Sequence, residues 1–166
     1  MPRLPLPSGG DLVSPEGMMI RLSQILPKKR AALVHVAPTA PVAIAVGLMK
    51  QHRVGSVLIL DPYGGLLGVL SERDVVHAFA SDPMHLLNKT VLEIARTEVP
   101  TASPEDTVQS VMEVMTATRS RHVPVIQFGR VVGLVSIGDV VKSRIEEQTR
   151  ENAVLQEIAR AQYFAG

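Results

Sequence analysis

Apolar residues recur along this chain in the same order twice, which predicts two copies of one structural unit. The first copy opens with the short apolar run 33–36 and continues with apolar residues at helical spacing over 42–49. Two more apolar runs, 57–60 and 66–70, flank a turn rich in proline and glycine and predict a buried hairpin. Ser71 then begins an amphipathic helix, so each copy reads strand, helix, strand, strand, helix.

The second copy repeats this order about 65 residues later. Its expected elements are strands over 99–102, 123–127 and 131–135, a helix over 104–118 and a helix from Ser136. Between the copies, residues 81–90 are polar and linker-like, and 91–95 are expected to form a short helix. A unit of about 60 residues buries little surface when alone, so we expect the two copies to share one core.

The most specific part of the repeat is a heptapeptide before each second helix. Residues 68–74 read GVLSERD and residues 133–139 read GLVSIGD. The first-turn amides of a helix attract an anion, and the aspartate of the motif can accept hydrogen bonds from two ribose hydroxyls. The alternative is a simple capping box, in which the serine caps the helix and the aspartate reaches back. The repetition of the motif favours the ligand interpretation.

Over about residues 23–143 the chain resembles a tandem pair of CBS domains, called a Bateman module. The resemblance is strongest in the two heptapeptides, in 51–55 (QHRVG) and in 121–125 (RHVPV). It implies an α/β (α+β) fold of two pseudo-symmetric β-α-β-β-α repeats packed through their sheets. It also implies two clefts between the repeats that bind adenosyl compounds such as AMP, ADP, ATP, NAD or S-adenosylmethionine.

This resemblance further implies which residues build the clefts across the pseudo-twofold axis. In one cleft Asp139 would hold the ribose, with Ser136 and the Gly138 amide beside it. The other residues implied there are Val34 and the backbone of Gly55, Ser56 and Val57 around adenine, and Arg121 and His122 toward phosphate.

In the second cleft Asp74 would hold the ribose, with Ser71 and Arg73 beside it. The residues implied around the base are Val99, Pro100 and the backbone of His122 and Val123. Pro100 has no amide hydrogen, so this cleft has one donor fewer than the family pattern.

The expected domain boundaries follow from these motifs. They are a disordered leader over 1–22, repeats over 23–83 and 84–143, and a helical extension over 144–166. The resemblance includes small stand-alone bacterial members that end in a charged helix. Two uses of the extension stay open: it folds back on its own repeat, or it forms a dimer contact. Gln148 and Asn152 interrupt its apolar seam, which argues against a long stable coiled coil.

Composition limits the partners. A net charge of +1 and 3% aromatic residues argue against a nucleic-acid-binding surface. The longest apolar run, 40–49, is far shorter than the roughly 20 residues of a membrane-spanning helix. The absence of cysteine favours a cytoplasmic location. The spacing of the five histidines predicts no metal site.

No nucleophile with an adjacent base is visible, so we expect no enzyme, no catalytic residues and no obligatory cofactor. The leading hypothesis is a regulatory, energy-sensing homodimer that binds an adenine nucleotide and changes its own or a partner's conformation. Two alternatives remain: a detached regulatory subunit of a metabolic enzyme or transporter, and a structural dimerisation unit with vestigial clefts.

Overall fold

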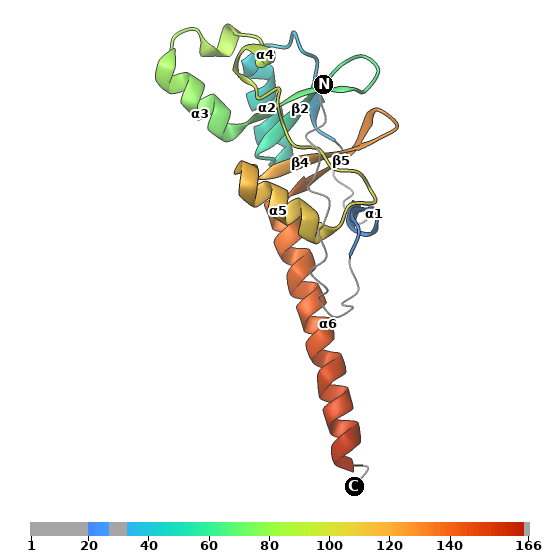
Figure 1. Cartoon of the computed structure of the whole chain (residues 1–166). Coiled ribbons are helices and arrows are strands. Elements are labelled where there is room, and N and C mark those ends of the chain that lie inside the picture. Colours follow the sequence, from blue (N-terminus) through green and yellow to red (C-terminus); the bar gives the residue numbers. More distant parts are fainter. Residues whose placement is uncertain (1–19, 27–32, 165–166) are drawn as a thin grey trace.

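The first repeat is built on a three-stranded sheet. The computed structural model describes residues 20–26 and 33–164, and the chain forms two αβ units followed by one long helix (Figure 1). The elements of the first repeat are β1 (His35–Val36), α2 (Val42–His52), β2 (Ser56–Leu60), β3 (Leu66–Ser71) and α3 (Glu72–Ser81). The strand order is β1-β2-β3. Strand β1 is parallel to β2, and β3 is antiparallel to β2. The strand, helix and hairpin predicted for this repeat are therefore confirmed.

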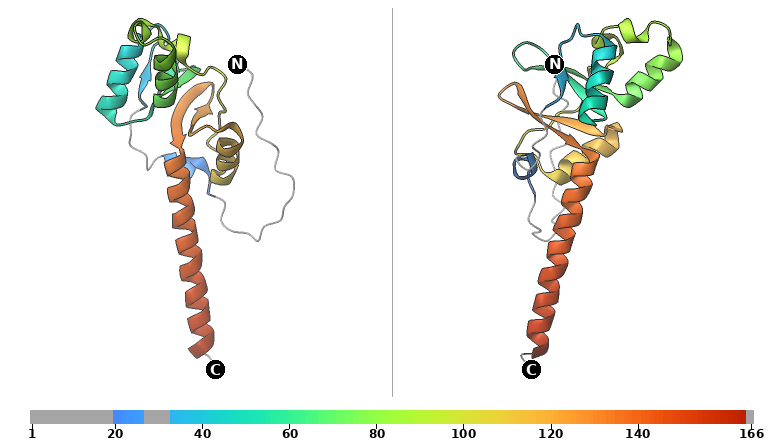
Figure 2. Two further views of the ribbon diagram at one scale, coloured as in Figure 1. Left: turned by 90° about the vertical axis from the view of Figure 1, so that its left-hand side faces the viewer. Right: turned by 180° about the vertical axis from the view of Figure 1, so that it is seen from behind.

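The second repeat has the same order of elements without the first strand, on a two-stranded sheet. Its elements are α5 (Val108–Thr118), β4 (His122–Gln127), β5 (Arg130–Ser136) and α6 (Ile137–Phe164). The two sheets lie next to each other in the middle of the body. Helices α2 and α3 cover the outer side of the first sheet, and α5 covers the outer side of the second (Figures 1 and 2).

Two predicted elements of the second repeat are shorter than expected. The strand predicted over 99–102 is reduced to one parallel bridge between Ala102 and Val125, because Pro100 has no amide hydrogen to extend the ladder. The helix predicted over 104–118 begins only at Val108, where Thr107 caps it. Residues 104–107 instead form a turn, in which the Ser103 amide donates to the Asp106 carboxylate at 2.6 Å.

The segments that precede each repeat pack on the other repeat. Helix α1 (Leu22–Ile25) lies on the second repeat, where the Leu22 amide donates to the Asp106 carbonyl and the Val108 amide donates to the Ile20 carbonyl, both at 2.9 Å. In the first repeat, the amides at the equivalent positions Val91 and Val42 donate to Ala40 and Lys89. The segment over 81–95, with η2 (Leu86–Asn88) and α4 (Val91–Ile94), thus packs on the first repeat.

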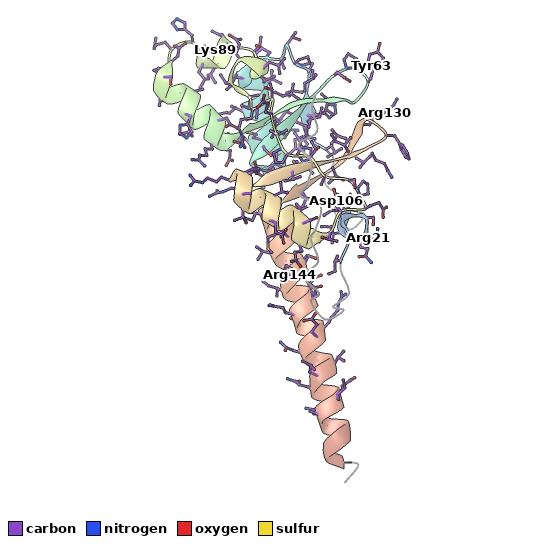
Figure 3. All side chains as sticks on the ribbon, in the orientation of Figure 1. Arg21, Tyr63, Lys89, Asp106, Arg130 and Arg144 are labelled. Atoms are coloured by element: carbon purple, nitrogen blue, oxygen red, sulfur yellow. The ribbon has the colours of Figure 1, made fainter. Side chains whose placement is uncertain are left out.

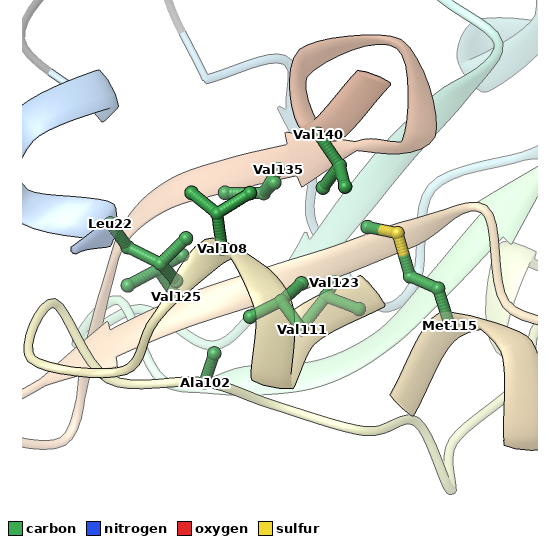
Figure 4. Close-up of a cluster of buried hydrophobic side chains, with 9 residues drawn as sticks. All are labelled: Leu22, Ala102, Val108, Val111, Met115, Val123, Val125, Val135 and Val140. Carbon is green, nitrogen blue, oxygen red and sulfur yellow. The ribbon is translucent and has the colours of Figure 1, made fainter. Parts of the chain in front are cut away.

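This exchange corrects the predicted leader boundary at its last residues. Leu22 falls within the predicted leader but is fully buried in the core of the second repeat, together with Val108, Val111 and Val125 (Figure 4). Residues 1–19, for which the sequence predicts disorder, lie outside the described residues. The predicted short helix after the linker is confirmed as α4.

Each repeat has its own apolar cluster of mostly β-branched residues, consistent with the low aromatic content. The first cluster contains Val36, Ala45, Met49, Val57, Ile59, Leu70 and Val91, and the second is shown in Figure 4. The two hairpin turns, marked by Tyr63 and Arg130, lie side by side (Figure 3). The Val131 amide donates to the Gly64 carbonyl at 3.1 Å, so a backbone hydrogen bond joins the two hairpins.

Helix α6 begins in the body and then projects away from it (Figures 1 and 2). Its first turns bury Val140 and Ser143, and all residues over 148–160 are exposed. The extension therefore does not fold back on its own repeat, which removes one of the two uses left open by the sequence.

Candidate functional site

Both Ser-x-x-Asp motifs form capping boxes at the start of a helix. In the first repeat the Asp74 Oδ2 accepts from the Ser71 amide at 2.9 Å and from the Ser71 hydroxyl, and the Asp74 amide donates back to the Ser71 Oγ at 3.3 Å. In the second repeat the Asp139 Oδ2 accepts from the Ser136 amide and hydroxyl, both at 2.7 Å. The capping-box alternative therefore describes the local geometry of both motifs.

A capping box uses one carboxylate oxygen and leaves the other directed elsewhere. The second oxygen of Asp74, Oδ1, lies 3.5 Å from the Arg96 Nε, in an ion pair whose Asp74 side chain is 15% exposed. Arg96 is held there by two backbone hydrogen bonds to Val69 in β3. A cation is thus fixed beside the carboxylate of the first motif.

Ser56 is the one buried side chain, among the described residues, whose polar atom has no hydrogen-bond partner. It is 2% exposed at the start of β2 and lies opposite Ser71 in the hairpin register. A buried hydroxyl without a partner costs about 1–3 kcal/mol, so its presence beside the first motif calls for an explanation.

The hairpin registers bring each motif next to the strand start of its own repeat. Ser56 and Val57 pair with Ser71 and Leu70, and the Gly55 carbonyl accepts from the Glu72 amide at 3.0 Å. The family resemblance assigns Gly55, Ser56 and Val57 to the Asp139 cleft. In the structure they lie beside the Asp74 motif of their own repeat, because an antiparallel hairpin sets the first residue of one strand opposite the last residue of the other.

The same rule applies in the second repeat. His122 and Val123 pair with Ser136 and Val135, and the Arg121 carbonyl accepts from the Ile137 amide at 2.9 Å. The starts of β2 and β4, one from each repeat, also lie close to each other. A Cβ atom on Gly55 would lie 3.8 Å from the His122 ring, so His122 borders both motifs across the pseudo-twofold axis.

The remaining predicted site residues take four kinds of position. Arg73 and Gly138 are exposed in the first turns of α3 and α6. The Val34 carbonyl accepts from the Leu58 amide at 3.0 Å, so Val34 belongs to the edge of the first sheet. Val99 is half-buried and Pro100 is buried in the segment that follows Arg96. Val57 and Val123 are core residues and offer only their backbone.

A cleft of about 270 Å³ lies beside Asp139. It is lined by Ile25, Leu26, Val135, Asp139, Lys142, Ser143 and Glu146. Ile25 and Leu26 come from the exchanged segment, and the last four residues come from one face of α6. Val34 and Gly55 are not among the lining residues of this cleft.

The predictions from sequence missed Arg96, Ile25, Leu26 and Lys142. Arg96 and Leu26 follow the two short helices, α4 and α1, whose sequences are typical of a linker and a leader. The first glycine of each heptapeptide, Gly68 and Gly133, was a signal that another segment packs against the strand there. A Cβ atom on Gly68 would lie 2.9 Å from the Arg96 carbonyl, and one on Gly133 would collide with Leu26, so a segment must cross each strand at its glycine.

Two other kinds of site are absent from the same part of the chain. Among residues 20–26 and 33–164, no three His, Asp or Glu side chains gather in a group that could hold a metal ion. No helix within those ranges has the length and apolar character needed to cross a membrane.

Comparisons with known proteins agree on one family. The family model of the CBS domain matches residues 25–81 and 91–146. The mitochondrial CBS-domain-containing protein CBSX3 of Arabidopsis thaliana is 35% identical over 120 residues, which cover 68% of this chain and 58% of that protein. The chain therefore spans less than two thirds of the length of this relative.

Solved structures show the same fold. A CBS-domain-containing protein of Agrobacterium tumefaciens is 36% identical with a TM-score of 0.73, covering 80% of this chain and 98% of that one. A CBS-domain protein of Pyrobaculum aerophilum, solved in complex with AMP, is 31% identical with a TM-score of 0.64, covering 72% of this chain and 89% of that one.

Proposed function

Because this chain belongs to the CBS-domain family and carries two CBS domains, we propose that it is a non-enzymatic regulatory module that binds an adenosyl ligand. The ligand class comprises AMP, ADP, ATP, NAD and S-adenosylmethionine. Binding changes the conformation of the module or of a protein that it regulates. The Pyrobaculum relative, with its bound AMP, supports an adenine nucleotide as the first ligand to test.

One observation carries the proposal: the same Ser-x-x-Asp helix start occurs twice, each time beside the start of a paired strand. The helices that follow, α3 and α6, have first-turn amides whose partial positive charge favours an anion. In the first repeat, the unpartnered Ser56 hydroxyl is a second feature that a polar ligand would satisfy.

The capping boxes are compatible with this role. The capping hydrogen bonds of Asp74 all go to Oδ2, so a ribose diol would approach Oδ1. That oxygen now faces Arg96 at 3.5 Å, and a bound ribose would replace this contact. The displaced guanidinium would remain near the ligand and could meet its phosphate, since guanidinium groups bind phosphate oxygens in pairs.

The test is thermal unfolding and calorimetry with AMP, and with adenosine for comparison. At a hundredfold excess over Kd, AMP should stabilise the fold by about 2.7 kcal/mol. Asp74→Ala and Asp139→Ala should each remove one site. Asp82→Ala is the matched control, because Asp82 caps the opposite end of the α3 helix. No shift of the melting curve with any of the five ligands would refute the proposal.

That negative result would favour a structural dimerisation unit with vestigial clefts. A role as a detached regulatory subunit of an enzyme or transporter, and a cytoplasmic location, stay predictions. The homodimer also stays a prediction, and α6 is the element to consider for its contact.

A further inference from the structure

Helix α6 carries a regular series of exposed positions along one side. Val141, Ile145, Gln148, Asn152 and Leu155 follow one another at alternating steps of four and three residues. This spacing is that of the a and d positions of a heptad repeat, with Ile145 and Asn152 at a. Val141, Ile145 and Leu155 are 50%, 59% and 63% exposed. We call these five residues the α6 seam.

The body of the molecule leaves this seam uncovered. The face of α6 that packs on the body contains Val140 and Ser143, which are 0% and 5% exposed. At the base of the helix, Ile137, Val141 and Ile145 line an open apolar groove. From this groove the seam continues through Gln148, Asn152 and Leu155 into the projecting part of the helix.

The projecting part needs a covering partner. Residues 148–160 are exposed on every side, and a helix of this length without tertiary contacts is marginal in water. Leu155 and Ile158 are 63% and 50% exposed, and they lie more than two turns beyond the last buried residue of the helix.

We propose that the α6 seam binds the α6 seam of a second copy in a parallel two-stranded coiled coil. This step does not depend on ligand binding. In a parallel pair every seam residue faces its own copy, so the apolar positions 141, 145 and 155 match automatically. The side-chain amides of Gln148 and Asn152 each have donors and an acceptor. Each can therefore form a hydrogen bond with the same residue of the second copy.

The polar seam residues select this arrangement instead of preventing it. An asparagine at one a position lowers the stability of a coiled coil but fixes its register and its two-stranded state. Asn152 occupies such a position between Ile145 and Leu155. The sequence prediction that a long stable coiled coil is disfavoured is consistent with a short pair that dissociates at low concentration.

Charge favours the parallel over the antiparallel orientation. In the parallel pair the flanking contacts are Arg144 with Thr149 and Glu151 with Gln156, which contain no like charges. In the antiparallel register that places Ile145 opposite Leu155, Glu151 of one chain would face Glu151 of the second copy. Like charges at such positions are destabilising.

Disulfide trapping tests the orientation, because the wild-type chain has no cysteine. Leu155→Cys should give a covalent dimer on mild oxidation, and Glu157→Cys, on the charged side of α6, should not. In the antiparallel register the two thiols introduced by Leu155→Cys would be about 15 Å apart along the helix axis. Cross-linking only in an equal mixture of Ile145→Cys and Leu155→Cys would overturn the parallel pair.

Light scattering tests the surface itself. Wild-type protein at micromolar concentration should have the mass of a dimer, and Leu155→Asp should lower it to that of a monomer. Val154→Asp is the matched control, since Val154 is 55% exposed but lies outside the seam. A dimer that survives Leu155→Asp, or a monomeric wild type, would overturn the proposal. Both substituted residues lie beyond the body, so the fold is expected to persist.

Discussion

A single buried hydroxyl in the first repeat allows the proposed ligand binding to be tested separately from stability. Ser56 Oγ has no hydrogen-bond partner and lies opposite Ser71. Ser56→Ala removes an unsatisfied group, so the ligand-free protein should become more stable by about 1 kcal/mol. If a ligand satisfies this hydroxyl, the same substitution should weaken AMP binding.

Urea unfolding and calorimetry would measure these two opposite effects. Ser120→Ala is the control, because Ser120 is another buried serine whose hydroxyl is not an unpartnered buried atom. Lower stability together with unchanged AMP affinity in Ser56→Ala would contradict the assignment.

Asp82 gives the fold a dependence on acidic pH. Its hydrogen bonds, first to Lys89 at 3.0 Å and then to His85 at 2.9 Å, lower the pKa of the carboxyl to about 2. The unfolded value is about 3.9, so the carboxylate stabilises the folded state above about pH 4, and this contribution is lost as the pH falls through about 2. The melting temperatures of wild type and Asp82→Asn should therefore converge between pH 5 and pH 2. A constant difference over that interval would show that Asp82 does not contribute in this way.

At the scale of elements, the exchanged segment α1 should be essential to the second repeat. Leu22 is 0% exposed among Val108, Val111 and Val125, so Leu22→Ala should destabilise the fold by about 2–5 kcal/mol. Ser23→Ala, at the exposed neighbouring position, should change little. Chemical unfolding of both variants decides the question, and equal stabilities would show that α1 only rests on the surface.

The sequence predicted most elements but not this exchange, for a physical reason. Periodicity reports local burial, and it located α2, the two hairpins and α3 because each has several apolar residues at regular spacing. Helix α1 has four residues, and its burial depends on partners some 80 residues away. The late start of α5 has the same cause, since the turn before Val108 pairs with Arg21.

The candidate site was predicted in part. Both aspartates and both serines are where the motif placed them, at helix starts after a strand. The turn over 61–65 sets Ser56 opposite Ser71, and the assignment of Gly55, Ser56 and Val57 to the Asp139 cleft stays a prediction. Arg96 was not found, because its place beside Asp74 depends on the crossing of a segment that looked like a linker.

At the scale of the whole molecule, α6 connects the two proposals. The first turns of α6 line the cleft beside Asp139 and also the adjoining groove with Val141 and Ile145, and Lys142 and Glu146 line both. A ligand that orders these turns in the cleft should therefore stabilise a second helix that packs against the adjoining groove.

We therefore expect AMP to strengthen the dimer, by at least the fivefold that corresponds to a coupling of about 1 kcal/mol. Coupling free energies are reciprocal, so the monomeric Leu155→Asp variant should bind AMP at the Asp139 cleft more weakly by the same factor. Sedimentation at several protein concentrations, with and without AMP, gives the first value, and calorimetry of Leu155→Asp in an Asp74→Ala background gives the second. The control is Val154→Asp in the same background, which should keep full affinity. Equal AMP affinity in the monomeric and dimeric proteins would show that α6 holds two independent surfaces, because no ligand can shift an equilibrium between states that it binds equally.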